Sequence, residues 1–253
     1  MSSKNTGLLV DKVVVITAAA GAGIGFATAK RALQEGAIVV LSDTHDGRLS
    51  SARSQLLEIS PDVHSRRCDV TSQTDVDSLF ESVEDTIGPI DVLVNNAGLG
   101  GSSSLVDMSD EEWNRVLDVS LTGTFRCTRA AMTLMCGRGS GVIVNVSSVT
   151  AWRAESGQSH YAAAKAGVMA LTRSAAMEAA PHGVRVNAIA PTLAMHPFIE
   201  KVADPEVLAH WISVQPQQRA AEPREMANVI IFLSSDLASY MTGEIVSVGS
   251  QKA

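Results

Sequence analysis

The chain has 253 residues, of which 45% are hydrophobic and 19% charged, and its formal net charge is −7. This length can bury one large core or two small ones, and the acidity argues against nucleic acid or an anionic membrane surface as the main partner. No apolar stretch approaches the roughly 18 residues that a membrane-spanning helix needs, and the polar start of the chain lacks a signal-peptide pattern.

Short runs rich in β-branched residues alternate with segments of helical period along the chain. Continuous apolar strands of this kind are typical of a parallel sheet that is buried on both faces. Strands are expected at 13–17, 38–42, 63–68, 92–95, 142–146, 184–189 and 245–248, and helices at 24–35, 72–87, 111–135, 161–180 and 223–234. We therefore predict an α/β fold over residues 1–253, a single doubly wound Rossmann-type domain with a mostly parallel seven-stranded sheet and helices on both faces.

A glycine-rich turn follows the first strand directly and leads into a helix, with glycines at Gly21, Gly23 and Gly25 and an isoleucine at Ile24. Glycines let the backbone approach a pyrophosphate, and the N-terminus of the helix supplies free N–H groups and the positive end of its dipole. The turn therefore predicts a dinucleotide-binding site. A turn used only for tight packing of the strand against the helix is the alternative.

The second strand ends at Asp43, 18 residues beyond Gly25. A carboxylate at this place can accept hydrogen bonds from the hydroxyls of an adenosine ribose and repels a 2′-phosphate, which predicts NAD as the cofactor. His45 and Arg48 stand close enough in the sequence to support a phosphate, so NADP is the alternative. Asp43 could also be a simple strand-end residue.

Tyr161 and Lys165 stand four residues apart in a predicted helix, and Ser148 precedes Tyr161 by 13 residues at the end of an apolar run. Residues four apart share one face of a helix, so the phenol and the ammonium can meet one small molecule. A neighbouring cation favours the ionised phenol and lowers its pKa, which indicates a proton-transfer site. The alternative is a core tyrosine beside a lysine that extends to water.

Residues 192–218 interrupt the regular alternation and combine three prolines with large apolar side chains. An apolar insertion after the carboxyl end of a strand lies where ligands bind in open α/β sheets, so we predict a substrate lid here. Its His196, Phe198 and Trp211 are assigned to the substrate pocket together with Trp152. A helical excursion without a lid function, and a structural role for His196, are the alternatives.

The ordered motifs resemble the short-chain dehydrogenase/reductase family from about residue 13 to 248. Each motif is modest alone, but their order and spacing are specific. They are the glycine-rich turn, Cys68-Asp69-Val70, Asn95-Asn96-Ala97-Gly98, Ser148, Tyr161 with Lys165, Arg185-Val186-Asn187, and Thr242-Gly243.

The resemblance implies a role for each catalytic residue. Tyr161 would give a proton to a ketone oxygen or take one from an alcohol, and Ser148 would hydrogen-bond the same oxygen. Lys165 would hold the nicotinamide ribose. Ser120 stands where the family often has an asparagine that holds a relay water, and it completes the predicted catalytic set. Without the other motifs, Ser148 would be read as a residue that only ends a strand.

The resemblance also implies further cofactor contacts. Asp69 would border the adenine, although it could instead cap the following helix. Asn95 would line the cofactor groove, although it could instead be a polar link between strands. The remaining predicted cofactor residues are Ala19, Val70, Ala97, Gly98, Pro191 and Leu193, together with Tyr161 and Lys165.

The chain departs from the family pattern at several places. Ala18 follows Thr17 where a glycine is usual, His196 stands where a threonine binds the carboxamide, and Val248-Gly249-Ser250 replaces a common Asp-Gly-Gly. This combination resembles a subgroup of actinobacterial reductases of steroid-ring breakdown that act on indane-type coenzyme A thioesters.

We therefore expect an NAD(H)-dependent oxidoreductase that interconverts a secondary alcohol and a ketone on a bulky apolar substrate, an acyl-CoA thioester from steroid-ring breakdown. An NADPH-dependent 3-oxoacyl-carrier-protein or acetoacetyl-CoA reductase is the rival within the same class. A catalytically silent dinucleotide-binding regulatory protein and an acidic interaction module without a ligand are rivals from other classes.

Three cysteines without paired spacing indicate reduced thiols and a cytoplasmic protein, and six dispersed histidines predict no metal site. The family resemblance suggests a homotetramer, built partly from the long helices at 111–135 and 161–180. These helices are rich in small and apolar residues.

Overall fold

The computed structural model describes residues 7–153, 155–196 and 205–249. Its centre is a sheet of seven strands in the order β3-β2-β1-β4-β5-β6-β7, and every neighbouring pair is parallel. The strands are β1 (Val13–Ile16), β2 (Ile38–Asp43), β3 (Val63–Arg67), β4 (Ile90–Asn95), β5 (Gly141–Val146), β6 (Val184–Pro191) and β7 (Ile245–Val248). The predicted fold class is confirmed, and the sheet is parallel throughout.

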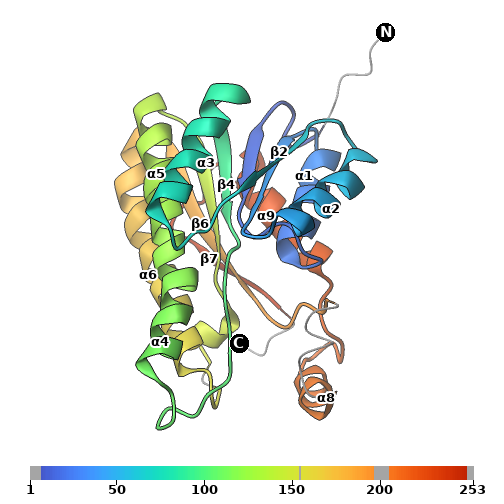
Figure 1. Ribbon diagram of the computed structural model, residues 1–253, viewed down its shortest axis with the longest axis vertical. Helices are drawn as coiled ribbons and strands as arrows, with labels where there is room; N and C mark the ends of the chain where they lie inside the picture. Colours follow the sequence, from blue (N-terminus) through green and yellow to red (C-terminus); the bar gives the residue numbers. More distant parts are fainter. Residues whose placement is uncertain (1–6, 154, 197–204, 250–253) are drawn as a thin grey trace.

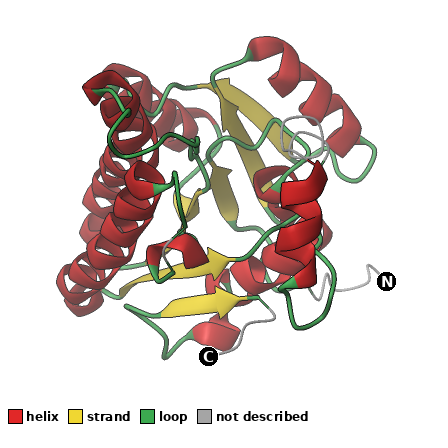
Figure 2. Cartoon of the chain, turned by 90° about the horizontal axis from the view of Figure 1, so that it is seen from below, coloured by secondary structure: helices red, strands yellow, loops and turns green. Residues whose placement is uncertain are grey.

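Helices cover both faces of the sheet (Figure 1). On one side lie α1 (Ile24–Gln34), α2 (Asp46–Leu57) and α9 (Pro223–Ser234), and on the other α3 (Gln73–Thr86), α5 (Gly123–Arg138) and α6 (Ser159–Ala179). Two further helices, α4 (Asp110–Leu117) and α8 (Pro205–Ser213), stand at one end of the molecule. Figure 2 is seen from that end and shows the sheet between the two helical layers.

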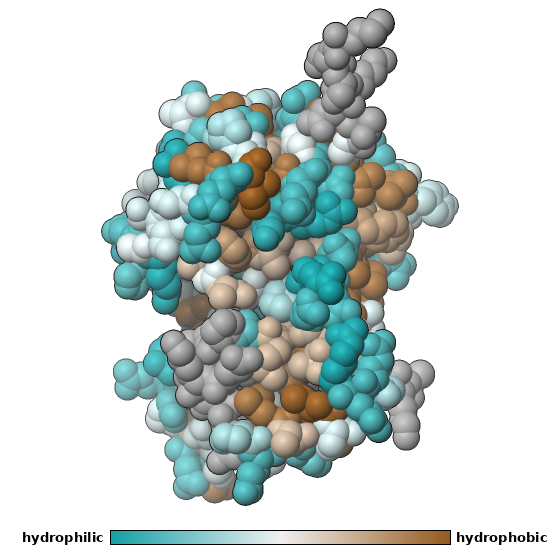
Figure 3. Space-filling model, turned by 90° about the vertical axis from the view of Figure 1, so that its right-hand side faces the viewer, coloured by the Kyte–Doolittle hydropathy of each residue, from teal (hydrophilic) through white to brown (hydrophobic). Residues whose placement is uncertain are grey.

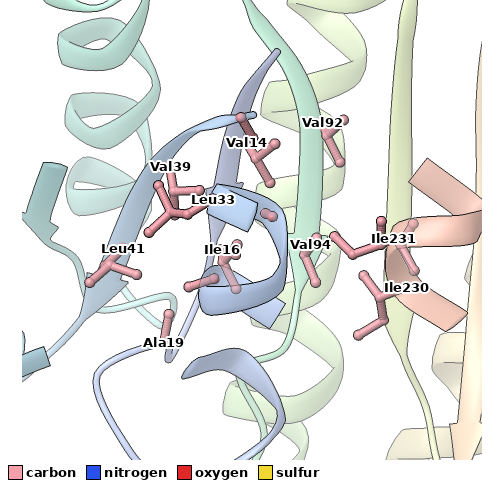
Figure 4. Close-up of a cluster of buried hydrophobic side chains, with 14 of the residues drawn as sticks. Val14, Ile16, Ala19, Leu33, Val39, Leu41, Val92, Val94, Ile230 and Ile231 are labelled. Carbon is pink, nitrogen blue, oxygen red and sulfur yellow. The ribbon is translucent and has the colours of Figure 1, made fainter. Parts of the chain in front are cut away.

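The inner strands of the sheet are mostly apolar because both of their faces are buried, whereas β3 at one edge reads Val-His-Ser-Arg-Arg and is only partly buried. Along β1, Val14 and Ile16 pack with α1 and α9, whereas Val13 and Val15 point to the opposite cluster. Figure 4 shows the first of these clusters, where side chains of β1, β2 and β4 meet Leu33 of α1 and two isoleucines of α9. A one-residue shift of β1 in this sheet would exchange its two faces.

The strand order reverses direction between β1 and β4. The chain leaves β1 for β2 on one side and leaves β4 for β5 on the other. The carboxyl ends of β1 and β4 therefore border the crevice in which doubly wound sheets bind ligands. The glycine-rich turn leaves β1 at this crevice, and Asn96 to Gly98 leave β4 at the same place.

Local signals account for most helix boundaries. Ser109 accepts a hydrogen bond from the N–H of Glu112, whose carboxylate accepts one from the N–H of Ser109, so a capping box starts α4. Gly139 has a φ of 78° and ends α5 in the left-handed conformation that glycine tolerates. Pro223 occupies the first position of α9, where its missing N–H has no helical partner to lose.

Two helical regions differ from the sequence expectation. The predicted helix at 111–135 is divided into α4 and α5 by a π-helical turn, η1 (Asp118–Thr122). Helix α2 was not predicted, because only Leu49, Ala52 and Leu56 of its residues are buried and the remainder is mostly polar. Among the described residues, no helix is both long and apolar enough to cross a bilayer.

Candidate active site

The glycine-rich turn is tied to the end of β4 by two side chains. Thr17 Oγ1 accepts hydrogen bonds from the backbone N–H groups of Asn96 at 2.9 Å and Ala97 at 3.0 Å. In return, Asn96 Nδ2 donates to the carbonyl oxygens of Thr17 and Ala18, both at 3.0 Å. Ala18 has a φ of 50°, so an alanine occupies a left-handed position that a glycine would fill without strain.

The start of α1 is open to an anion. A Cβ at Gly25 would lie 2.5 Å from Asn96 Nδ2 and 2.8 Å from the carbonyl oxygen of Ala18, so only glycine fits there. Gly23 is the N-cap of α1, no side chain caps the helix, and its first turn holds no acidic residue. The free N–H groups and the positive end of the dipole therefore suit a pyrophosphate, as predicted from Gly21, Gly23, Ile24 and Gly25.

Asp43 ends β2 with a nearly buried carboxylate. Its Oδ1 accepts hydrogen bonds from the backbone N–H of His45 at 3.1 Å and from Nη2 of Arg48 at 2.9 Å. These two contacts orient the carboxylate at the end of β2. The same contacts hold the guanidinium of Arg48 against the carboxylate at the end of β2.

Asp69 and Val70 are both engaged within the protein. Asp69 Oδ1 accepts hydrogen bonds from N and Oγ1 of Thr71 at 2.9 and 2.7 Å, so it stabilises its own turn, whereas Ser72 is the N-cap of α3. Val70 is buried, and its Cγ2 would lie 2.6 Å from a Cβ at Gly123 of α5. Both residues stand at the carboxyl end of β3, on the edge of the predicted adenine region.

Asn95 forms the polar link between strands that the sequence left open as the alternative to lining the cofactor groove. Asn95 is only 2% exposed, and its Nδ2 donates to Thr128 Oγ1 at 3.0 Å and Asn145 Oδ1 at 2.9 Å. Asn145 Nδ2 in turn donates to Thr172 Oγ1 at 2.9 Å. The two asparagines thus link β4, β5, α5 and α6 inside the core. Asn96 is the asparagine that holds the turn.

Ser148, Tyr161 and Lys165 converge at the carboxyl end of β5. Ser148 begins the short 3₁₀ helix η2 (Val149–Ala151), and the other two residues lie in the first turns of α6. The Tyr161 hydroxyl is hydrogen-bonded to the Ser148 side chain. Lys165 Nζ donates to the carbonyl oxygen of Val146 at 2.8 Å and lies 5.7 Å from the centroid of the Tyr161 ring.

The loop after β4 covers these side chains closely. A Cβ at Gly98 would lie 3.1 Å from Lys165 Nζ, and one at Gly100 would lie 3.9 Å from the Tyr161 ring. The buried hydroxyl of Ser120 holds this loop from the other side, accepting from the N–H of Leu99 at 2.9 Å and donating to its carbonyl at 3.1 Å. The single proton of the Ser120 hydroxyl is therefore bonded to the backbone of the loop.

Burial sets the pKa values of the phenol and the ammonium. Burial raises the pKa of Tyr161, and the nearby Glu155 carboxylate adds to this effect, whereas the hydrogen bond to Ser148 opposes it. Burial also lowers the pKa of Lys165 from 10.5 to about 8. The expectation that Lys165 lowers the phenol pKa is wrong for this structure, because desolvation dominates and the ammonium is bonded to Val146. Tyr161 is therefore protonated at neutral pH, as an acid must be.

A cavity of about 400 Å³ opens beside Ser148. Its walls come from η2, the following loop, the carboxyl end of β6 and the region of α8. The lining residues are Ser148, Val149, Thr150, Arg153, Glu155, Gln158, Pro191, Thr192, Leu193, Trp211, Val214, Gln215 and Pro216. Figure 3 faces the side of α1, α2 and α8 and shows apolar surface gathered in its lower part, at the level of α8.

A larger opening of about 790 Å³ lies at the other ends of the strands. It is lined by Lys12 and Asp91, which form an ion pair at 3.0 Å, and by Arg185, whose guanidinium donates to the carbonyl oxygens of Leu233 and Ser235. The predicted catalytic residues do not line it. The smaller cavity at the carboxyl ends of the strands is therefore the candidate substrate site.

Comparison with known proteins decides the family. A family model described as enoyl-(acyl carrier protein) reductase matches residues 18–250. A Mycobacterium tuberculosis protein named (5R,7aS)-5-hydroxy-7a-methyl-1-oxo-2,3,5,6,7,7a-hexahydro-1H-indene-carboxyl-CoA reductase is 55% identical over 247 residues, covering 97% of this chain and 94% of its own. The chain belongs to the short-chain dehydrogenase/reductase family.

Other members agree with this assignment. A 3-oxoacyl-[acyl-carrier-protein] reductase of Thermotoga maritima is 39% identical and covers 95% of this chain and 97% of its own length. A solved short chain dehydrogenase of Mycobacterium smegmatis is 52% identical, with a TM-score of 0.86, and the match covers 100% of this chain and 98% of that one. This short-chain dehydrogenase/reductase is thus an oxidoreductase, and its relatives are named as reductases and dehydrogenases.

The family binds a nicotinamide dinucleotide, and this oxidoreductase has residues that fit one. The pyrophosphate would fit at the start of α1, where Gly25 leaves no room for a side chain and no side chain caps the helix. Asp43 fits the adenosine ribose, and Lys165 lies directly against Gly98 where a second ribose would approach.

The four residues predicted for the substrate pocket have different outcomes. Trp211 of α8 lines the cavity, whereas Trp152 is 48% exposed and is not among the lining residues. His196 is also absent from the lining, and its imidazole lies against Gly23 of the cofactor turn instead. Phe198 lies outside the described residues.

Pro191 and Leu193, both predicted as cofactor residues, line the candidate substrate cavity. Several other residues that line this cavity were not predicted. Arg153, Glu155 and Gln158 line the same cavity and carry polar groups. Their position between Ser148 and Tyr161 in the sequence is the signal that could have identified them.

Proposed function

We propose that this protein is an NAD(H)-dependent oxidoreductase that interconverts a secondary alcohol and a ketone on a bulky apolar acyl-CoA thioester from steroid-ring breakdown. The observation that carries the reaction type is the hydrogen bond between the hydroxyls of Tyr161 and Ser148 at the edge of the cavity. The substrate class is supported by the name of the Mycobacterium tuberculosis relative, with which this chain shares 55% of its residues.

When bound, a reduced dinucleotide would supply a hydride to the carbonyl carbon. Ser148 and Tyr161 both donate hydrogen bonds to the ketone oxygen, and Tyr161 gives it a proton as the hydroxyl group forms. The raised pKa of Tyr161 keeps that proton available at neutral pH. Lys165 binds the nicotinamide ribose with Nζ, and its pKa of about 8 allows proton exchange near neutral pH. For alcohol oxidation, the proton moves in the opposite direction.

The cavity suits a compact apolar ring system. Its volume of about 400 Å³ lies near the lower end of the range for small-molecule sites. Val149, Leu193, Trp211 and Val214 provide apolar walls on two sides. The coenzyme A portion is too large for this space and would extend past α8 to solvent. We propose residues 192–218 as the lid over the ring system.

The choice of NAD is supported by the Asp43 carboxylate. Its acceptor oxygens suit ribose hydroxyls, whereas a 2′-phosphate would meet a like charge. The dissociation constants of NADH and NADPH, measured by fluorescence titration, test this choice, and we expect tighter binding of NADH. The Asp43→Asn variant should lose most of that preference because Arg48 is released from its carboxylate partner. Stronger binding of NADPH by the unchanged protein would contradict the proposal.

The function is tested with a panel of coenzyme A thioesters that carry a ring ketone, together with the corresponding free acids. NADH oxidation is followed at the nicotinamide absorbance. We expect turnover of the bicyclic keto thioesters, and a loss of about 100-fold or more in kcat for Tyr161→Phe with NADH binding retained. Tyr240→Phe, which changes a fully exposed tyrosine, is the matched control. Near-normal turnover of Tyr161→Phe would refute the catalytic assignment.

A 3-oxoacyl-carrier-protein reductase that uses NADPH is the second candidate, and the Thermotoga maritima relative favours it at 39% identity. Preferential reduction of linear 3-oxoacyl thioesters with NADPH would identify it. The absence of turnover across both panels, despite measured NADH binding, would instead identify a silent dinucleotide-binding protein.

We also propose a cytoplasmic homotetramer. Its support is the exposure of Phe125 on α5 and Met177 on α6, two apolar side chains on the long helices, and the three free thiols. Sedimentation analysis tests the number of subunits, and a monomer would contradict the proposal.

A further inference from the structure

His196 lies at the cofactor turn. A Cβ at Gly23 would lie 3.6 Å from Cδ2 and 3.8 Å from Nε2 of the imidazole. Gly23 is the residue from which α1 begins, so the ring stands at the N-terminus of that helix.

The backbone holds His196 in this position. Met195 N donates to the carbonyl oxygen of Ala221 at 2.8 Å, and Ala221 N donates to that of Leu193 at 3.0 Å, so a short parallel bridge fixes the segment. Ala194 is buried in the cluster that contains Ala19 of the cofactor turn. In an extended segment, residues two apart point to the same side. The bridge that directs Ala194 toward the turn therefore directs His196 toward it as well.

The start of α1 provides little positive charge of its own. Residues 18–25 contain no lysine, arginine or histidine. The guanidinium of Arg48 is paired with Asp43, and the ammonium of Lys165 is bonded to the carbonyl of Val146. A bound diphosphate would therefore meet backbone N–H groups and the helix dipole, which are partial charges. An imidazole can add a side-chain N–H donor at this place, and a full charge when it is protonated.

We propose that His196 binds the diphosphate of the dinucleotide together with the first N–H groups of α1. This inference rests on the proposed dinucleotide-dependent function and deepens it. His196 follows the carboxyl end of β6, so its bond to the diphosphate would join the segment after this strand to the bound cofactor. The residue thus contributes to cofactor affinity rather than to the shape of the substrate cavity.

The test compares ligands with and without a diphosphate. Binding of adenosine, AMP, ADP-ribose and NADH to the full-length protein is measured by isothermal titration calorimetry. For His196→Ala, we expect the affinities for ADP-ribose and NADH to fall about tenfold or more, as for a lost hydrogen bond to a charged group, while that for adenosine stays unchanged. His196→Gln keeps an N–H donor and should lose less. His182→Ala, which changes an exposed histidine on η3 (Ala180–His182), is the control.

The outcomes separate the inference from the function on which it rests. If the unchanged protein binds none of the dinucleotides, the proposed function fails and the inference fails with it. If the unchanged protein binds NADH and His196→Ala binds ADP-ribose equally well or more tightly, only the inference is overturned. A rise in the KM of the ketone with unchanged NADH affinity would return His196 to the substrate pocket. An equal loss for adenosine and ADP-ribose would show damage to the whole site and also overturn the assignment.

Discussion

Replacing Lys165 with methionine should stabilise the fold while it destroys the active site. Lys165 is only 2% exposed, and burial lowers the pKa of its ammonium from 10.5 to about 8. At about 1.36 kcal/mol per pKa unit, keeping the charged form in the folded state at pH 7 costs on the order of 3 kcal/mol. Methionine has a similar length and no charge. The lost bond to the carbonyl of Val146 offsets about 1–2 kcal/mol. The expected net gain is about 1–2 kcal/mol at pH 7.

The gain should depend on pH in a defined direction. The folded-state pKa of Lys165 is lower than that of the unfolded chain, so between about pH 8 and 10.5 the unfolded chain binds more protons. The free energy of unfolding of the unchanged protein therefore rises with pH through this window, as Lys165 loses its proton. The rise that is due to Lys165 ends above about pH 10.5. Lys165→Met lacks this contribution. Its advantage should be largest at pH 7 to 8 and should shrink toward pH 10.5.

Urea unfolding at several pH values between 7 and 10, followed by circular dichroism, measures this difference. Lys30→Met changes an exposed lysine of α1 and is the control, with an expected effect within about 0.5 kcal/mol at every pH. A Lys165→Met protein that is less stable than the unchanged one at pH 7, or a difference that is constant with pH, would refute the reasoning from desolvation.

Three further substitutions test the loops around the site. Gly25→Ala would place a Cβ against Asn96 Nδ2, so we expect a loss of about 2–3 kcal/mol in thermal unfolding and weaker NADH binding. Gly137→Ala, in an open part of α5, is its control and should be neutral or stabilising. Ala18→Gly removes the strain of an alanine at positive φ. It should leave the free energy of unfolding unchanged or raise it by up to about 1 kcal/mol, and a lower free energy of unfolding would argue against strain at this position. Ser120→Ala leaves the two backbone groups of the partly buried Leu99 without this partner. Both kcat and the free energy of unfolding should therefore fall, the latter by about 1–2 kcal/mol, and an unchanged kcat would exclude a positioning role.

Patterns that repeat along the chain predicted the fold. Val13 to Ile16 are buried on both faces, so an uninterrupted apolar run was enough to predict a parallel strand. Pro223 marks the start of α9 at the predicted residue, because proline restricts the backbone locally. Helix α2 was missed since it covers an edge of the sheet with only three buried side chains, and a mostly polar pattern carries little signal.

The proximity of the three candidate catalytic residues was predicted for the same reason. Ser148, Tyr161 and Lys165 stand in or beside regular elements, so their spacing along the chain fixes their approach, and the structure brings them together. The burial of Asn95 between two strands and two helices could not be predicted from the spacing of residues along the chain. Its partners lie 33 and 50 residues away, and no local pattern distinguishes them from an equally spaced polar pair.

The sequence by itself determined the strands, the order of the motifs and the residue types that can transfer a proton. Only the tertiary structure decided which groups are desolvated and which partner each side chain meets. It reversed the expected pKa shift of Tyr161, paired Asp43 with Arg48 and placed His196 against Gly23. Periodicity and turn chemistry act over a few neighbouring residues, whereas desolvation and pairing depend on elements that are distant in the sequence and meet only after folding.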